Sequence, residues 1–217
     1  MIRFSRVSRK VIGANESVRG TLEDINLVLP TNRKVAILGA ERAAMTTFLH
    51  LLAGSEVPDR GSVVIERHNL SPIVNSGGGA GSNLLPQLTA MENVRFFARL
   101  HGLDALTLKQ IIEWACHFGS MWDEPIRLFD WPRRRALETA LIAALPYDCY
   151  LVDHLHTMAG ELCWLLATRV RERRAGWIFT TDNFNIAQKF GEVCVVIEDR
   201  SVHVFPTMAQ ARSAYSF

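Results

Sequence analysis

The stretch that decides the fold is KVAILGAERAAMTTFLHLLAG, residues 34–54. Its first six residues, KVAILG (34–39), are mostly apolar and include two β-branched residues, which predicts a buried strand. AAMTTFLHLLAG (43–54) follows at once, and its apolar residues recur at helical spacing before a closing glycine. A buried strand that leads through a short turn into a helix is the building unit of α/β proteins.

The turn between this strand and helix resembles a phosphate-binding pattern, GxxxxGK[ST]. In that pattern backbone amides and a lysine surround phosphates, and the final hydroxyl binds magnesium. The segment here reads GAERAAMT, so the first glycine and the hydroxyl are present, while alanine replaces the second glycine and methionine the lysine. Taken alone, the segment also fits an ordinary turn between a strand and a helix. The nucleotide-binding candidates are Gly39, Ala44, Met45, Thr46 and Thr47.

The rest of the chain alternates strands and helices, which predicts a mostly parallel sheet covered by helices. Residues 71–83 are rich in glycine and serine and predict a loop. No strand pattern occurs from Thr89 to about Arg135, and Thr89 stands three residues before Glu92, the spacing of a capping box. Further strands are predicted at INLVLP (25–30), SVVIE (62–66), CYLVDH (149–154), GWIFTT (176–181), VCVVIE (193–198) and SVHVF (201–205).

Composition narrows the functional classes. The 217 residues are 48% hydrophobic and 21% charged, which fits a folded globular domain. A net charge of +2 provides no broad basic surface, so no nucleic-acid partner is expected. Four cysteines are too few for a disulfide scaffold, and no apolar run reaches the roughly 18 residues of a membrane span. We therefore expect a cytoplasmic protein that another chain would have to hold at a membrane.

Four segments of the chain, in order, resemble ABC-transporter ATPases. They correspond to the stretch after the phosphate-loop helix, the start of the helical subdomain, the signature helix with the Walker B strand, and the switch-histidine strand. The second and third are especially similar to the ATPase subunits of capsular-polysaccharide and O-antigen exporters. The segments are LAGSEVPDRGSVVIE (52–66), LTAMENVRFFARLHGL (88–103), EPIRLFDWPRRRALETALIAALPYDCYLVDH (124–154) and IFTTDNFNIAQKFGEVCVVIEDRSV (178–202).

The resemblance implies an α/β fold, the P-loop NTPase-type ABC nucleotide-binding domain. Residues 1–217 would form one such domain, with a small β subdomain built from the first strands. A helical subdomain would occupy about residues 85–135. The family's membrane subunits are separate chains, so the resemblance implies a membrane subunit as partner, together with a homo- or hetero-dimer of ATP-binding subunits.

The catalytic positions that the resemblance assigns depart from the family. Asp153 matches the Walker B carboxylate and, with Thr46, forms the magnesium side of the site. His154 stands at the catalytic glutamate position, and Asp182 stands at the switch histidine. The signature becomes DWP (130–132), in which the aspartate repels phosphate and the proline lacks a backbone donor.

These departures predict a pseudo-ATPase. Loss of a general base alone lowers a rate by about 10² to 10⁴, so no catalytic residue is assigned, and binding of ATP and magnesium is expected to be weak or absent. We expect the subunit to act by docking, on the cytoplasmic face of the inner membrane. Two alternatives stay open: an active ATPase with remodelled motifs that drives capsular polysaccharide export, with His154 as base, and a soluble regulatory interaction module.

Two further patterns receive ordinary interpretations. His154 and His156 with Cys149 and Cys163 match no usual zinc spacing, so no zinc site is expected. The aromatic residues Phe96, Phe97 and Trp114 lie at helical spacing and are interpreted mostly as core. The resemblance also makes them candidates for the groove that receives a helix of the membrane subunit.

Overall fold

The computed structural model describes residues 1–12, 18–66, 69–74, 83–198 and 200–214, without the side chains of residues 11, 12 and 18–21. The chain divides into two compact units. The first, which we call the core unit, comprises Met1–Ser76, Asp148–Thr157 and Arg174–Phe217. The second, the helical unit, comprises Gly77–Tyr147 and Met158–Arg173, so it contains the expected 85–135 segment and a later helix as well.

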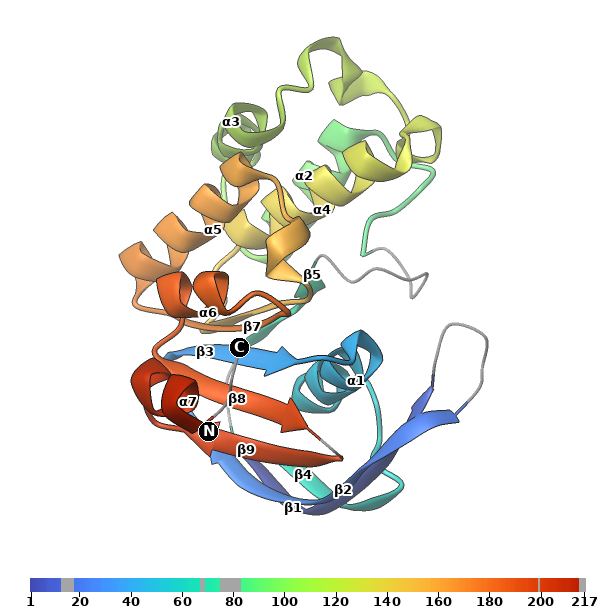
Figure 1. Cartoon of the computed structure of the whole chain (residues 1–217). Helices are drawn as coiled ribbons and strands as arrows, with labels where there is room; N and C mark the ends of the chain where they lie inside the picture. The colour runs from blue at the N-terminus through green and yellow to red at the C-terminus, as the bar shows by residue number, and fades with distance from the viewer. Residues whose placement is uncertain (13–17, 67–68, 75–82, 199, 215–217) are drawn as a thin grey trace. The chain divides into compact units, whose positions relative to one another are not determined.

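The core unit contains a six-stranded sheet in the order β5-β6-β7-β3-β8-β9 (Figure 1). Five strands run parallel, and β9 pairs antiparallel with β8. The predicted parallel sheet is therefore confirmed, and β3 and β7 have the predicted bounds. The strands are β3 (Lys34–Gly39), β5 (Leu70–Val74), β6 (Cys149–Val152), β7 (Gly176–Thr181), β8 (Val193–Glu198) and β9 (Ser201–Phe205).

The predicted loop at 71–83 is wrong at its start, because Leu70–Val74 form strand β5. This strand is at the edge of the sheet, where Pro72 can be accommodated without breaking a pairing on both sides. Residues 75–82 of that predicted loop lie outside the described residues.

A second, antiparallel sheet in the core unit has the order β2-β1-β4. It consists of β1 (Ile2–Ile12), β2 (Val18–Leu29) and β4 (Arg60–Ile65). Ile2, Phe4 and Val7 of β1 are buried, while Arg3 and Ser5 are exposed. This alternation is typical of a sheet with one face on the core and one face in water. Strand β2 extends well beyond the predicted segment 25–30.

Helix α1 (Arg42–Ala53) joins the two sheets of the core unit into one hydrophobic core (Figure 1). Its side chains Phe48, Leu49 and Leu52 are fully buried in a cluster that includes residues of both sheets. Gly54 ends the helix in the left-handed conformation, with φ 69°, as the closing glycine predicted. Helices α6 (Phe184–Phe190) and α7 (Met208–Ala214) contact strands β3, β7, β8 and β9 of the parallel sheet.

The helical unit is held by local networks of polar groups as well as by apolar packing. The predicted capping box is confirmed, because Thr89 Oγ1 accepts from the Glu92 amide and Glu92 Oε2 accepts from the Thr89 amide. The fully buried Asn93 exchanges hydrogen bonds with the backbone of Leu85. The elements of the helical unit are α2 (Ala90–Leu100), α3 (Ala105–Cys116), the 3₁₀ turns η1 (Gly119–Asp123) and η2 (Ile126–Leu128), α4 (Trp131–Ala144) and α5 (Gly160–Arg173).

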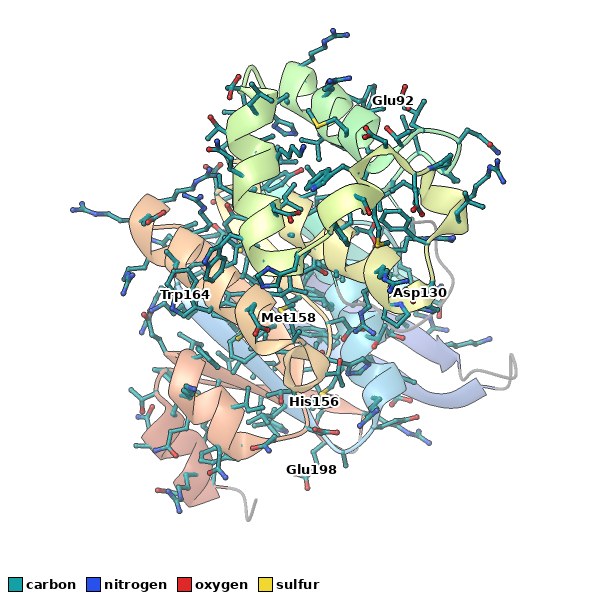
Figure 2. All side chains as sticks on the ribbon, turned by 90° about the horizontal axis from the view of Figure 1, so that it is seen from above. Glu92, Asp130, His156, Met158, Trp164 and Glu198 are labelled. Carbon is teal, nitrogen blue, oxygen red and sulfur yellow. The ribbon has the colours of Figure 1, made fainter. Side chains whose placement is uncertain are left out.

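The interpretation of the helical-unit aromatics as mostly core is wrong for two of the three. Phe96 is 46% exposed and Trp114 is 49% exposed. Trp114 packs instead against Trp164 of α5, itself 56% exposed and labelled in Figure 2, with ring centroids 4.8 Å apart. These rings therefore lie on the surface of the helical unit.

Within the described residues, no helix has both the length and the apolar character that crossing a bilayer requires.

Candidate functional site

The candidate site lies in the core unit, where the carboxyl ends of parallel strands β3, β6 and β7 meet. Polar residues follow each strand: Glu41 after β3, Asp153 and His154 after β6, and Asp182 after β7. This edge of an open α/β sheet is where such folds bind ligands. The sheet therefore brings together most of the residues that the sequence analysis singled out.

The loop between β3 and α1 is too short to surround a phosphate. The pattern GxxxxGK[ST] would need a loop from Gly39 to residue 44, but α1 already begins at Arg42. The N-cap residue Glu41 makes no side-chain hydrogen bond to the helix and brings a negative charge to its start. Gly39 has a packing role, since an added Cβ would lie 3.1 Å from the Ile197 carbonyl oxygen and 3.2 Å from Met45 Cγ.

The residues at the second-glycine and lysine positions are part of the hydrophobic core. Met45 is fully buried, and Ala44 and Thr47 are 5% and 8% exposed. Met45 belongs to the same cluster as Val35 and Ile37 of β3. The side chain at the lysine position thus packs against apolar residues of the sheet.

The two magnesium-side candidates are bonded to each other. Thr46 Oγ1 donates to Asp153 Oδ2 at 2.8 Å, and Thr180 Oγ1 donates to Asp153 Oδ1 at 2.5 Å. Asp153 has no exposed surface. A buried carboxylate is stabilised when hydrogen-bond donors satisfy its oxygens. These bonds tie β6 to α1 and to β7.

His154 lies beside this carboxylate. Its Nε2 is 3.6 Å from Asp153 Oδ2 and 3.4 Å from Thr46 Oγ1, and its amide donates to Thr180 Oγ1 at 2.7 Å. Its backbone is in the left-handed region, with φ 47°. Burial lowers the pKa of His154, opposed by the charge of Asp153 and reinforced by those of Arg42 and His156. The imidazole is therefore held in its neutral form.

Two residues that the sequence analysis did not assign, Arg42 and His156, complete the cluster. Arg42 Nη2 donates to Asp182 Oδ2 at 2.9 Å and lies 3.4 Å from His156 Nε2. His156, in the short turn η3 (Leu155–Thr157) and labelled in Figure 2, has its Nδ1 3.3 Å from Asp182 Oδ1. The signal for Arg42 was present in the sequence, as a cation inside the phosphate-loop segment.

The charges in this cluster favour an ionised Asp182. Burial acts to raise the pKa of this carboxyl, but the hydrogen bond from Arg42 and the charges of His156 and Arg42 lower it overall. The side chains of Arg42 and Asp182 are 60% and 36% exposed. Ion pairs with this exposure contribute about 0–1 kcal/mol, so competing ions can replace them.

The residues do not fit magnesium-ATP as the phosphate-loop chemistry requires. The cation position is filled by a buried methionine, and the loop is shortened by the early start of α1. On the magnesium side, by contrast, Thr46 and Asp153 retain the hydroxyl and the carboxylate that the pattern requires, 2.8 Å apart. Among the described residues, no group of three or more His, Cys, Asp or Glu side chains is arranged so that it could hold a metal ion. Burial raises the pKa of the Cys149 thiol to about 12, which leaves it protonated.

The signature position DWP lies in the helical unit and caps a helix. Asp130 is the N-cap of α4, and its Oδ1 accepts from the Arg133 amide at 2.9 Å. Pro132 lies in the first turn, where a missing amide proton costs no helical hydrogen bond. Trp131 is 53% exposed, and Arg135 Cζ lies over its ring, 4.9 Å from the ring centroid.

Comparison with known proteins first defines the class. No protein-family model matches the chain. It superposes on the solved ATP-binding subunit of an ABC transporter with a TM-score of 0.74, at 16% identity, over 99% of this chain and 92% of that one. A dimeric ATP-binding cassette bound to ADP and Pi gives a TM-score of 0.69 at 17% identity, over 94% and 98%. The fold is thus the P-loop NTPase-type ABC nucleotide-binding domain.

Sequence relatives then define the family. The chain is 27% identical to the ATP-binding protein BexA of Haemophilus influenzae, over 100% of this chain and 98% of the relative. Identity is 25% to the capsule polysaccharide export ATP-binding protein CtrD of Neisseria meningitidis, over 100% and 99%. It is 30% to an O-antigen export system ATP-binding protein, RfbB of Klebsiella pneumoniae, over 82% and 73%. The chain belongs to this family of ABC-transporter ATP-binding subunits.

The lowered pKa of His154 predicts a pH-dependent stability. As the pH falls through about 6.5, the unfolded chain takes up a proton that the folded chain resists, so the free energy of unfolding decreases. His154→Gln should reduce this decrease between about pH 7.5 and pH 5.5. Chemical denaturation at the two pH values measures it.

The control is His203→Gln, which removes an exposed imidazole on β9. It distinguishes loss of the buried ring from loss of any histidine. If the free energy of unfolding depended equally on pH in the wild type and in His154→Gln, the lowered pKa would not belong to His154.

Proposed function

We propose that this chain is the cytoplasmic ATP-binding-cassette subunit of a polysaccharide-export ABC transporter and that it does not hydrolyse ATP. The observation that carries the second part is the complete burial of Met45 at the lysine position. Lysine at this position would hold the β- and γ-phosphates. A methionine in the core holds neither, and its side chain contributes to stability instead.

The remaining catalytic groups support the same proposal. A general base has to reach the proton that it removes. The residue at the catalytic glutamate position, His154, lies beside Asp153 and Thr46, whose own oxygens are already hydrogen-bonded. Groups that operate as a unit in catalysis are not replaced by one survivor. We therefore assign no catalytic residue and expect weak or absent magnesium-ATP binding, with a dissociation constant of about 1 mM or higher.

The export assignment rests on the relatives. CtrD is named for capsule polysaccharide export and RfbB for O-antigen export, and both resemble most of this chain. We propose that the chain acts in the same class of process, bound to a membrane subunit at the cytoplasmic face of the inner membrane. A dimer with itself or with an active ATP-binding subunit would follow the dimeric cassette to which its fold is similar.

Helix α2 offers the surface that we propose for docking. Phe96 and Leu100 are 46% and 67% exposed and line a groove of about 600 Å³. Arg95, Arg99 and the acidic Glu92 line it as well, so the charged side chains of the groove leave a net positive charge beside the apolar ones. A surface of this kind accepts an amphipathic helix with acidic residues on its flanks. The same groove would serve if the chain were a regulatory module with a different partner.

The first prediction of this proposal concerns turnover. The purified chain should release no more phosphate from magnesium-ATP than Asp153→Asn, which removes the remaining Walker B charge and controls for contaminating ATPases. A steady-state rate of about one turnover per second would contradict the proposal if Asp153→Asn abolished it. That result would favour the active-ATPase alternative.

The second prediction concerns restoring the lysine. Met45→Lys should not produce turnover, and it should lower the free energy of unfolding by about 3 kcal/mol, because the ammonium group enters an apolar cluster. Met45→Leu is the matched control and should cost less than about 1.5 kcal/mol. Urea denaturation and an ATPase assay on the three proteins measure both effects. Robust turnover by Met45→Lys would show that the methionine alone silences the site.

The third prediction concerns docking. When tagged chain is purified from detergent-solubilised membranes, the membrane subunit should co-purify, and Phe96→Asp should reduce its recovery at least about tenfold by desolvating a charge in the groove. Leu106→Asp, which alters a 63% exposed leucine on α3 outside the groove lining, is the control and should leave recovery unchanged. Equal loss in both variants would exclude α2 as the docking helix.

A further inference from the structure

The ion-pair cluster at the strand ends of the core unit is not explained by the loss of catalysis alone. Loss of function requires only that phosphate-binding groups disappear. Here a cation, Arg42, stands at the start of α1, and it pairs with a carboxylate, Asp182, that follows strand β7. A third element contributes His156, which contacts both of them.

The geometry around Arg42 is that of an occupied anion site. A guanidinium group presents its N–H donors as a fork that matches the oxygens of a carboxylate or a phosphate. The two oxygens of Asp182 are divided between Arg42 and His156, at 2.9 Å and 3.3 Å. Arg42 is also the first residue of α1, and the start of a helix favours negative charge. A phosphate group would meet the same donors.

We propose that Asp182 is a built-in substitute for a phosphate, which closes an anion site made by Arg42 and His156. This inference rests on the proposed function, because it treats the site as one that no longer turns over ATP. The ligand class that the site would accept is a phosphate or polyphosphate anion, either free or as part of a nucleotide. Binding then requires that Asp182 release Arg42 and His156.

The charges that face the cluster determine whether removal of the Asp182 charge strengthens or weakens anion binding. With Asp182 ionised, its charge offsets that of Arg42, and Glu41 adds a negative charge at the start of α1. Asp153 is buried nearby but its oxygens accept hydrogen bonds from Thr46 and Thr180. Removal of the Asp182 charge therefore leaves Arg42 and His156 without their anionic partner, while the rest of the site is unchanged.

The test compares Asp182→Asn with the wild type by isothermal titration against inorganic pyrophosphate and, separately, against ATP, each without magnesium. We expect the variant to bind pyrophosphate at least about tenfold more tightly than the wild type, whose dissociation constant should be about 1 mM or higher. A comparable gain with ATP would identify the phosphate chain as the recognised group, and a gain with ATP alone would assign the site to nucleotides.

The matched control is Glu192→Gln. Glu192 also pairs with basic residues, Arg33 and Lys34, and its backbone pairs with Lys34 at the amino end of β3, the opposite end of the sheet. Its replacement changes the net charge equally and should leave pyrophosphate affinity unchanged. Adding Arg42→Gln to Asp182→Asn should abolish the gain. Thermal unfolding of every variant checks the fold, and Asp182→Ser repeats the test if the asparagine variant fails to fold.

Unchanged affinity for both pyrophosphate and ATP in both Asp182 variants would overturn this inference, and so would micromolar binding of either ligand by the wild type. Neither result bears on the proposed loss of hydrolysis, which is measured by phosphate release from magnesium-ATP. An equal gain in Glu192→Gln would assign the effect to net charge and would also overturn the inference.

Discussion

The burial of α1 against both sheets is the constraint on which the core unit depends. The helix supplies Phe48, Leu49 and Leu52 to a cluster that contains residues of the antiparallel and the parallel sheet. Each fully buried side chain of this size contributes about 1.5–3 kcal/mol. Because α1 begins at Arg42, residue 45 falls on its buried face. The position that could hold a phosphate-binding lysine therefore belongs to the core, and fold stability and nucleotide chemistry make opposite demands on it.

The features that local sequence determines could be predicted. Strand β3 is a continuous apolar run between polar residues, and the capping box of α2 depends on two residues three positions apart. Strand β1 was missed because its alternation of apolar and polar residues breaks at Arg6, where the backbone has φ 50° and the register shifts, so that the next buried residue after Phe4 is Val7. Edge strand β5 was missed for a similar reason, since its partner β6 follows about 80 residues later.

The residues of the candidate site also fall into those that could be predicted from the sequence and those that could not. Gly39 and Thr46 could be located from the spacing of the phosphate-loop pattern, and Asp153 and His154 from the resemblance to ABC-transporter ATPases. The sheet brings all four to one edge. The partnership of Arg42 with Asp182 could not, because 140 residues separate them and the fold alone makes them neighbours. The burial of Met45 depends on where α1 starts, and the spacing of a motif does not contain that information. Sequence patterns identify which residues face a site, while packing decides whether they reach it.

The cap at the start of α4 has a consequence for assembly. Asp130 neutralises the positive end of that helix and accepts the Arg133 amide, its carbonyl accepts the Arg134 amide, and Pro132 has no amide proton. The helix end therefore presents a carboxylate and an exposed indole to any neighbour. In the proposed dimer, a pair of identical chains would carry this surface twice, whereas a mixed pair would carry it once. The composition of the dimer would thus set how many copies of this carboxylate and indole it contains.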